Sequence, residues 1–151
     1  MAAYKHILVP TDGSPLSLKA AKAAATLAHS LNAKITAMHV IAPFAPPRDS
    51  ESAIIFADAY TPGLYKKRTE EIAGNALDKI EAQAKALGVP CARVFVTSGA
   101  PWEAIIETAG KRKCDLIVMA SHGRRGLAGL LLGSETTKVL THSKIPVLVC
   151  R

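Results

Sequence analysis

Aromatic residues are scarce in this chain of 151 residues, since Phe, Trp and Tyr together make up only 5% of it. Hydrophobic residues nevertheless account for 49% and charged residues for 21%, a composition typical of a globular protein and not of a disordered one. Much of the apolar content is alanine, so we expect helices and sheet to pack closely through small side chains. The length suits one domain, and we expect residues 1–151 to form a single one.

Cysteines are few, and long apolar runs are missing. Cys91, Cys114 and Cys150 are widely spaced and form no CxxC pair, which indicates reduced, mostly buried thiols. The histidines are not spaced with them as zinc ligands would be, so no metal site is predicted. We find neither a signal peptide nor an apolar stretch of about 20 residues that could span a membrane. The sequence therefore predicts a cytoplasmic protein with no membrane partner.

The formal charge of +7 is spread along the chain, apart from short basic runs at residues 66–68, 111–113 and 124–125. No run interleaves aromatic with basic residues, as a nucleic-acid-binding face would. We therefore expect a solvated basic surface and no nucleic-acid partner.

Several sequence motifs for phosphate binding and hydrolysis are absent. The chain contains no GxxxxGK[ST] loop, and Thr11-Asp-Gly-Ser14 stands where a GxGxxG fingerprint would follow the first strand. The Ser-Gly-Gly-x-Asp-Ser loop of ATP pyrophosphatases is missing as well. A GxSxG nucleophile elbow is also absent, so hydrolysis by an activated serine lacks its usual signal.

The pattern of apolar residues predicts five strands that alternate with four helices. The predicted strands cover residues 4–10, 34–41, 91–97, 115–119 and 145–150. Helices are predicted from Ser14 to Leu31, from Leu64 to Leu87, from Pro101 onward and from Ser134 onward. Residues 42–61 are expected to form a long loop, with a short helix over residues 53–59. Such alternation indicates an α/β fold with a parallel sheet covered by helices on both faces.

A glycine-rich loop joins the strand at residues 115–119 to the helix that follows. It contains Gly123, Gly126, Gly129 and Gly133, and Ser134 is predicted to be the N-cap of the helix. Glycine allows close backbone approach, and a helix N-terminus attracts anions, so this loop is predicted to hold the phosphates of a nucleotide. In parallel sheets ligands bind beyond the carboxyl ends of strands, which here carry the turns at residues 10–12, 39–41 and 120–123.

The chain resembles the universal stress protein family, in its ATP-binding branch. The resemblance covers the whole chain, and it is carried by Tyr4–Ser14, His39-Val40, Asp115–Gly123, Leu131–Ser134 and Ile145–Val149. The family's nucleotide loop follows the pattern Gly-x2-Gly-x9-Gly-[Ser/Thr]. Gly123, nine residues and then Gly133-Ser134 match it, whereas Ala120 replaces the first glycine. The resemblance implies a three-layer α/β/α fold of the adenine nucleotide alpha-hydrolase type, with five parallel strands in the order 3-2-1-4-5.

The resemblance also implies a set of residues that bind ATP, with or without Mg²⁺. Asp12 would meet the ribose hydroxyls or the adenine, Val40 would meet the adenine through its backbone, and Met119 would line the base pocket. A carboxylate at Glu135 would repel phosphate unless it points away or shares a metal ion. The implied nucleotide-binding residues are Pro10, Thr11, Asp12, Val40, Met119, Ala120, His122, Gly123, Arg124, Gly133, Ser134, Glu135 and Thr136.

Function follows from the resemblance as an expectation with two alternatives. We expect an ATP-binding stress-response regulator that acts as a nucleotide-dependent switch, with no dedicated catalytic residues. One alternative is a dimeric interaction module that does not bind ATP, and the other is a weak ATPase or nucleotidyl-transfer enzyme. The last strand is expected to lie at a sheet edge and to form a homodimer near Pro146–Cys150. His39 is expected to be an ordinary strand histidine with its hydrogen bonds satisfied.

Overall fold

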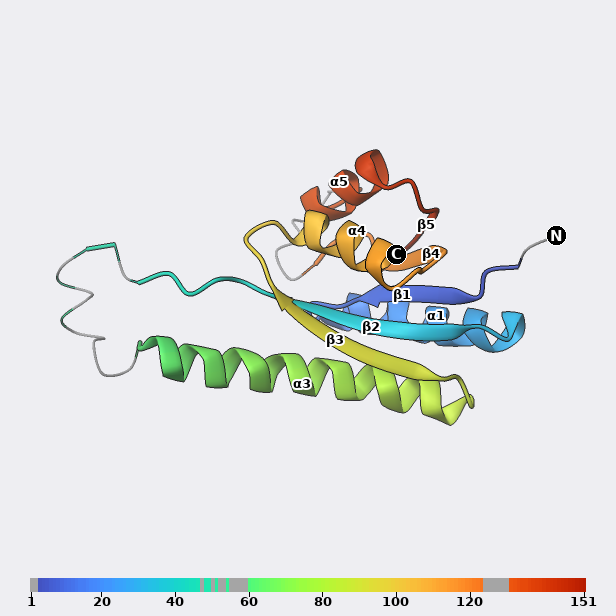
Figure 1. Cartoon of the computed structure of the whole chain (residues 1–151), viewed down its shortest axis with the longest axis horizontal. Coiled ribbons are helices and arrows are strands. Elements are labelled where there is room, and N and C mark those ends of the chain that lie inside the picture. Colours follow the sequence, from blue (N-terminus) through green and yellow to red (C-terminus); the bar gives the residue numbers. More distant parts are fainter. Residues whose placement is uncertain (1–2, 47, 50, 52–53, 55–59, 124–130) are drawn as a thin grey trace.

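The computed structural model of the chain describes residues 3–46, 48–49, 51, 54, 60–123 and 131–151. Within these residues, five parallel strands form one sheet in the order β3-β2-β1-β4-β5 (Figure 1). The strands are β1 (His6–Pro10), β2 (Lys34–Ile41), β3 (Cys91–Thr97), β4 (Leu116–Ala120) and β5 (Val147–Cys150). The described helices are α1 (Pro15–Leu31), α3 (Pro62–Ala86), α4 (Pro101–Lys111) and α5 (Ser134–His142). The predicted fold class and strand order are confirmed.

The sheet separates two hydrophobic cores, because successive side chains of a strand point to opposite faces. Ile7 and Val9 of β1 pack in the core beneath α1 and α3, whereas Leu8, between them, packs in the core beneath α4 and α5. Figure 1 shows these two helix pairs on opposite sides of the sheet. The strands buried on both faces explain the continuous apolar runs of the sequence.

Small side chains form the surface with which α1 packs against the sheet. Its buried residues are Ser17, Ala20, Ala21, Ala24, Ala25 and Ala28. Helical spacing of the apolar residues from Leu16 predicts a buried face that includes Ala23 and omits Ala21 and Ala25, but in the structure Ala23 is exposed and the other two are buried. Since alanines occur all around this helix, their spacing alone does not identify the buried face. The same spacing predicts that Ile72 of α3 and Leu87, its C-cap residue, are buried, yet they are 48% and 38% exposed.

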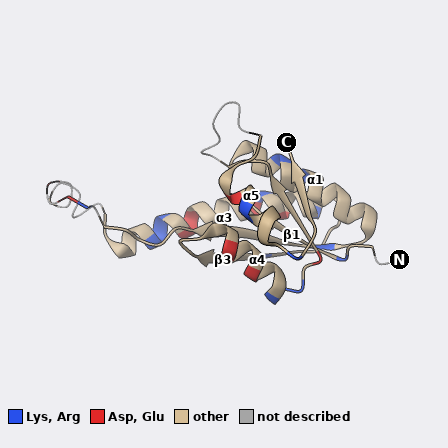
Figure 2. Ribbon diagram, turned by 90° about the horizontal axis from the view of Figure 1, so that it is seen from above, with Lys and Arg blue, Asp and Glu red and all other residues tan. Residues whose placement is uncertain are grey.

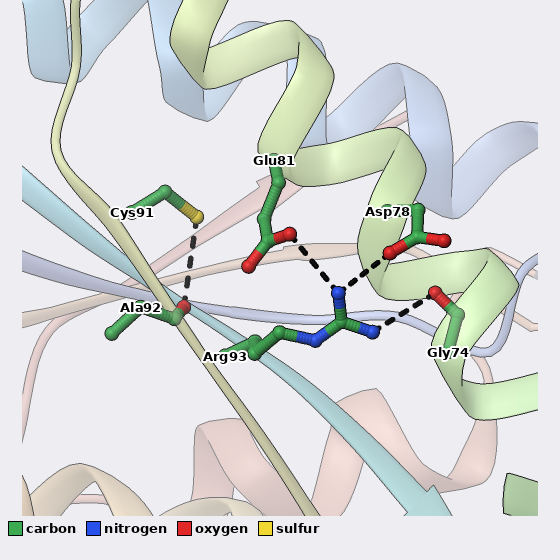
Figure 3. Close-up of polar contacts among 6 residues, drawn as sticks. All are labelled: Gly74, Asp78, Glu81, Cys91, Ala92 and Arg93. Carbon is green, nitrogen blue, oxygen red and sulfur yellow. Dashed lines mark hydrogen bonds and ion pairs between the residues drawn. The ribbon is translucent and has the colours of Figure 1, made fainter.

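Arg93 on β3 links this edge strand to α3 through hydrogen bonds (Figure 3). Arg93 donates hydrogen bonds to Asp78 Oδ1 at 2.6 Å, to Glu81 Oε2 at 3.0 Å and to the carbonyl of Gly74 at 3.1 Å. The hydrogen bond to Asp78, more than any other contact, raises the pKa of Arg93. The three acceptors lie on about two turns of the helix, so a single guanidinium group holds α3 in position along the strand.

The segment between β2 and α3 leaves the sheet beyond its carboxyl edge, where Figure 1 shows α3 extending past the strands. Phe44, Tyr60 and Tyr65 form an aromatic cluster with ring centroids 5.2–6.2 Å apart. The Tyr65 hydroxyl also donates to the carbonyl of Ala42 at 2.6 Å. This cluster ties the start of α3 to the chain that leaves β2. The short helix predicted over residues 53–59 lies largely outside the described residues.

All three cysteines are free thiols. Cys114 is buried, and burial raises its pKa to about 11, whereas Cys91 and Cys150 are half-buried.

Figure 2 shows residues of both charge signs along the ribbon, on α3 and α4 alike. In the part of the chain that the structure describes, no helix is long and apolar enough to cross a membrane.

His6 lies buried at the amino end of the sheet. Its Nε2 atom lies 2.7 Å from the hydroxyl oxygen of Thr36 on the neighbouring strand. Burial, reinforced by the nearby charge of Lys34, lowers the pKa of His6 below its ordinary value of 6.5. The folded protein therefore binds a proton at this site less readily than the unfolded chain does.

We predict that His6 makes unfolding easier as the pH falls below about 6.5. In that range the unfolded histidine gains a proton that the folded one resists, so the free energy of unfolding decreases until the pH reaches the lower folded pKa. Urea denaturation of the wild type and His6→Gln at pH 7.5 and 5.5, values of about one unit on either side of 6.5, measures this effect. The variant should lose less stability between the two pH values. An equal loss in both proteins would contradict the prediction.

Candidate functional site

The turn between β1 and α1 is held by a network of short polar side chains. The Thr11 hydroxyl is buried, contacts the Ser17 hydroxyl at 2.8 Å and accepts a hydrogen bond from the Gly13 N–H at 3.0 Å. Gly13 has a φ of 79°, a left-handed conformation that glycine adopts without strain. Asp12 accepts from the Ser14 N–H at 2.9 Å, which orients its carboxylate. The turn therefore presents the Asp12 side chain in a defined position.

Ser14 caps α1 as predicted. Its hydroxyl oxygen accepts a hydrogen bond from the Ser17 N–H at 3.2 Å, and Pro15 occupies the first helical position. Proline suits that position because its missing N–H would have no partner inside the helix. The sequence signal for the start of α1 was therefore reliable.

The glycine-rich loop between β4 and α5 is closed at its base by two hydrogen bonds. The Gly133 N–H donates to the carbonyl of Ser121 at 2.7 Å, and the buried Thr136 hydroxyl donates to the carbonyl of Ala120 at 2.9 Å. A Cβ on Gly133 would lie 3.1 Å from the Cα of His122, a tight contact, so glycine at position 133 lets the two ends of the loop meet without a shift of the backbone. Arg124, Gly126 and Gly129 lie outside the described residues.

The prediction that Ser134 is the N-cap of α5 is wrong by one residue. Gly133 is the N-cap, with φ −71° and ψ 161°, and Ser134 is the first helical residue. No side chain of the described residues caps this helix. The first N–H groups of a helix lack partners within it, and they favour an anion at that end. Ser134 is exposed there, so its hydroxyl lies at the open end of the helix.

The Glu135 carboxylate points away from this helix end. Its Oε2 atom accepts a hydrogen bond from the Trp102 N–H at 2.9 Å. It therefore caps α4, whose own N-cap residue, Ala100, makes no capping bond. The Trp102 ring packs in turn on His142 of α5, with ring centroids 4.7 Å apart. Glu135 thus joins α4 to α5, and the repulsion of phosphate considered from the sequence does not arise.

The two turns meet beside β1 and β4, where the strand order reverses. A Cβ built on Gly123 would overlap the Asp12 carboxylate, so only glycine at position 123 leaves that carboxylate in place. Ligands of open parallel sheets bind at such reversal points, beyond the carboxyl ends of the strands. An acidic side chain from one turn and a glycine loop from the other therefore form one candidate site.

Comparison with known proteins fits this geometry. The family model described as the universal stress protein family matches residues 3–151. The chain belongs to the universal stress protein family. The universal stress protein MJ0531 of Methanocaldococcus jannaschii is 36% identical over 98% of this chain and 82% of its own length. A universal stress protein of Thermus aquaticus is 34% identical over 98% of this chain and 99% of its own.

Two solved structures share the fold at more than 30% identity. The structure of the hypothetical protein MJ0577 has a TM-score of 0.77 and 33% identity, and the match covers 98% of this chain and 96% of that one. A universal stress protein in complex with cAMP has a TM-score of 0.68 and 31% identity, and the match covers 99% and 98% of the two chains.

In this universal stress protein, the predicted site residues divide into two groups. The side chains of Pro10, Thr11, Met119, Ala120 and Thr136 are buried within the sheet or in the hydrogen bonds described above. They form the floor of the site. Residues that are at least partly exposed around it are Asp12, Val40, His122, Gly123, Gly133, Ser134 and Glu135.

Ala120, the one departure from the family's loop pattern, ends β4 in ordinary strand geometry. It pairs in register with Cys150, and its φ is negative. The added Cβ therefore causes no backbone strain at this position. Two further contributors had no signal in the sequence: the Ser121 carbonyl that closes the loop and the Trp102 N–H that holds Glu135.

The loop closure predicts an asymmetry between two neighbouring threonines of α5. Thr136→Val leaves the buried carbonyl of Ala120 without its partner, which should lower the free energy of unfolding by about 1–3 kcal/mol. Thr137→Val is the matched control, because the Thr137 hydroxyl is exposed and donates to Gly133 within the helix. Thermal and urea unfolding should show a clear loss for the first variant and little change for the second. Equal losses would show that the Thr136 bond does not hold the loop.

Proposed function

We propose that this protein binds an adenine nucleotide, with ATP as the ligand, between the β1–α1 turn and the glycine loop. The observation that carries the proposal is the approach of the Asp12 carboxylate to Gly123 at the reversal point of the sheet. A carboxylate accepts hydrogen bonds from the ribose hydroxyls, and the uncapped N-terminus of α5 suits a phosphate. The 31% identical relative solved with cAMP supports an adenine nucleotide as the ligand class.

Each part of the nucleotide has a counterpart among the residues of the site. Asp12 binds the ribose, and the backbone of Val40 binds the adenine. Met119, buried at the end of β4, forms the floor beneath the base. The triphosphate lies over the loop, where it accepts hydrogen bonds from the Ser134 hydroxyl and from the N–H groups of the first residues of α5. Arg124, which the resemblance places among the nucleotide-binding residues, remains part of this proposal.

The biological role that we infer is regulation during stress, with ATP acting as the signal and not as a substrate. Among the described residues, no three His, Cys, Asp or Glu side chains gather as they would around a metal ion. Glu135 is held by α4 and does not face the loop, so it is not positioned to activate a water molecule there. The proposed role therefore rests on binding and on the structural change that binding brings to the loop.

ATP binding is tested by titration with a fluorescent ATP analogue. Asp12→Ala and Gly123→Ala should each weaken ATP binding by about tenfold or more. Asp12→Ala removes the carboxylate that accepts from the ribose, and Gly123→Ala displaces this carboxylate with the added Cβ. Gly110→Ala is the matched control, since a Cβ at that exposed helical position meets nothing within 4 Å. Mass spectrometry of nucleotide released from the purified protein would identify the natural ligand.

The titration also separates the alternatives. A folded wild-type protein that binds no ATP at millimolar concentration would refute the proposal and favour an interaction module. Release of AMP and pyrophosphate with an acceptor present would favour a nucleotidyl-transfer enzyme instead.

We also propose a homodimer formed through β5. This strand lies at one edge of the sheet, and Leu148 at its centre is 43% exposed. An uncovered edge strand tends to pair with another chain. Sedimentation at micromolar concentration should give twice the chain mass of 15.9 kDa, and Leu148→Lys should give the chain mass. A monomeric wild-type protein would contradict this proposal.

A further inference from the structure

The hydrogen-bond ladder between β1 and β2 ends at Thr11, whose carbonyl is bonded to a histidine side chain and not to the backbone of β2. The Thr11 N–H donates to the carbonyl of Met38 at 2.8 Å, as a regular parallel ladder requires. In the next position of such a ladder, the Val40 N–H would donate to the carbonyl of Thr11. The structure instead shows His39 Nδ1 at 2.9 Å from that carbonyl oxygen. A carbonyl can only accept, so Nδ1 carries the proton and donates.

His39 reaches this carbonyl from the face of the sheet. Ile35 and Ala37 of β2 lie in the core beneath α1 and α3, and His39, two residues further along, points to the same face. The carbonyl of Thr11 therefore accepts from the imidazole, and among the described residues it accepts no backbone hydrogen bond from the Val40 N–H. This happens one residue before Asp12, so the same hydrogen bond also fixes the start of the turn that carries the proposed ribose acceptor.

The backbone of Val40 is left facing the site. Met38 and Val40 have the same parity in β2, so the N–H and C=O groups of both are directed toward β1. Those of Val40 make no backbone hydrogen bond to β1 among the described residues. The Gly13 N–H, which would be the next donor along the β1 side, donates to the Thr11 hydroxyl instead. Val40 thus presents one donor and one acceptor side by side, as the edge of an adenine requires.

We propose that His39 is a positioning residue for the adenine. By occupying the Thr11 carbonyl, its imidazole prevents the Val40 N–H from closing one more rung of the ladder and keeps that peptide edge available to the base. The inference rests on the proposed function, because it assigns the adenine to Val40. It adds a residue that touches no part of the nucleotide and acts through Thr11 and Val40.

Substitutions at position 39 separate the hydrogen bond from the bulk of the ring. His39→Asn keeps a donor at the second atom from Cβ, where Nδ1 lies, whereas His39→Leu fills similar space with no donor. In the leucine variant the Thr11 carbonyl loses the hydrogen bond from His39. The Val40 N–H, which is in register with this carbonyl, can then donate to it in place of the imidazole. A buried or half-buried carbonyl favours such a replacement because an unmet acceptor is costly.

The first measurement needs no nucleotide. Amide hydrogen exchange of the free protein, followed by NMR, should show a slowly exchanging Val40 N–H in His39→Leu. The same amide should exchange rapidly in the wild type and in His39→Asn. Equal exchange in all three proteins would overturn the inference, whatever the protein binds.

The second measurement concerns the ligand and uses ATP and inorganic tripolyphosphate as probes. His39→Leu should weaken ATP binding by about tenfold while tripolyphosphate binding stays unchanged, and His39→Asn should restore ATP binding. Equal weakening for both probes would indicate a general structural defect and would contradict the inference. If the wild type binds neither probe, the proposed function fails, and the exchange measurement still decides the role of His39. Should the leucine variant not fold, His39→Gln, whose donor lies one atom further out, replaces it in both measurements.

Discussion

The contact between the Asp12 carboxylate and Gly123 is the constraint on which the site depends. The two residues belong to turns that follow β1 and β4, and these strands are neighbours in the sheet although more than 100 residues separate them. A side chain at position 123 would take the space of the carboxylate. Everything else in the site is arranged around this approach: the Asx turn orients Asp12 from one side, and the closure of the glycine loop brings Gly123 from the other.

The loop is held by its ends, through Gly133 to Ser121 and Thr136 to Ala120. Both bonds use carbonyl groups at the end of β4, so α5 begins directly above the sheet. Glu135 then connects α5 to the first turn of α4. Hydrogen bonds therefore connect the base of the loop to α4 on one side of the sheet. The remaining helices, α1 and α3, form the opposite layer.

The fold could be predicted from the sequence because short apolar strand segments alternate with helical segments along the chain. The start of α1 was predicted correctly because Ser14 and Pro15 are strong local signals. The start of α5 was wrong by one residue, since Gly133 and Ser134 both suit an N-cap and only the hydrogen bond to Ser121 distinguishes them. The buried face of α1 was also misjudged, because alanines surround the helix.

The polar contacts within the site were beyond prediction for a different reason. Glu135 and Trp102 are 33 residues apart, and His39 and Thr11 are 28 apart, so no local pattern relates them. Each contact exists only because the sheet brings two turns together. His39 was predicted to be a strand histidine with its hydrogen bonds satisfied, and the structure shows its Nδ1 atom bonded to the Thr11 carbonyl. Its proposed effect on Val40 follows only from the register of the ladder. The turns that carry the candidate site residues were thus predictable from the sequence, whereas the hydrogen-bond partners of these residues were not.

The central claim is that an adenine nucleotide binds where Asp12 meets the glycine loop. A crystal structure of the protein grown with ATP tests it most directly. We expect the ribose within hydrogen-bond distance of Asp12, the adenine edge against the backbone of Val40, and the phosphates over the N–H groups at the start of α5. A nucleotide bound elsewhere, or an empty site at saturating ATP, would contradict it.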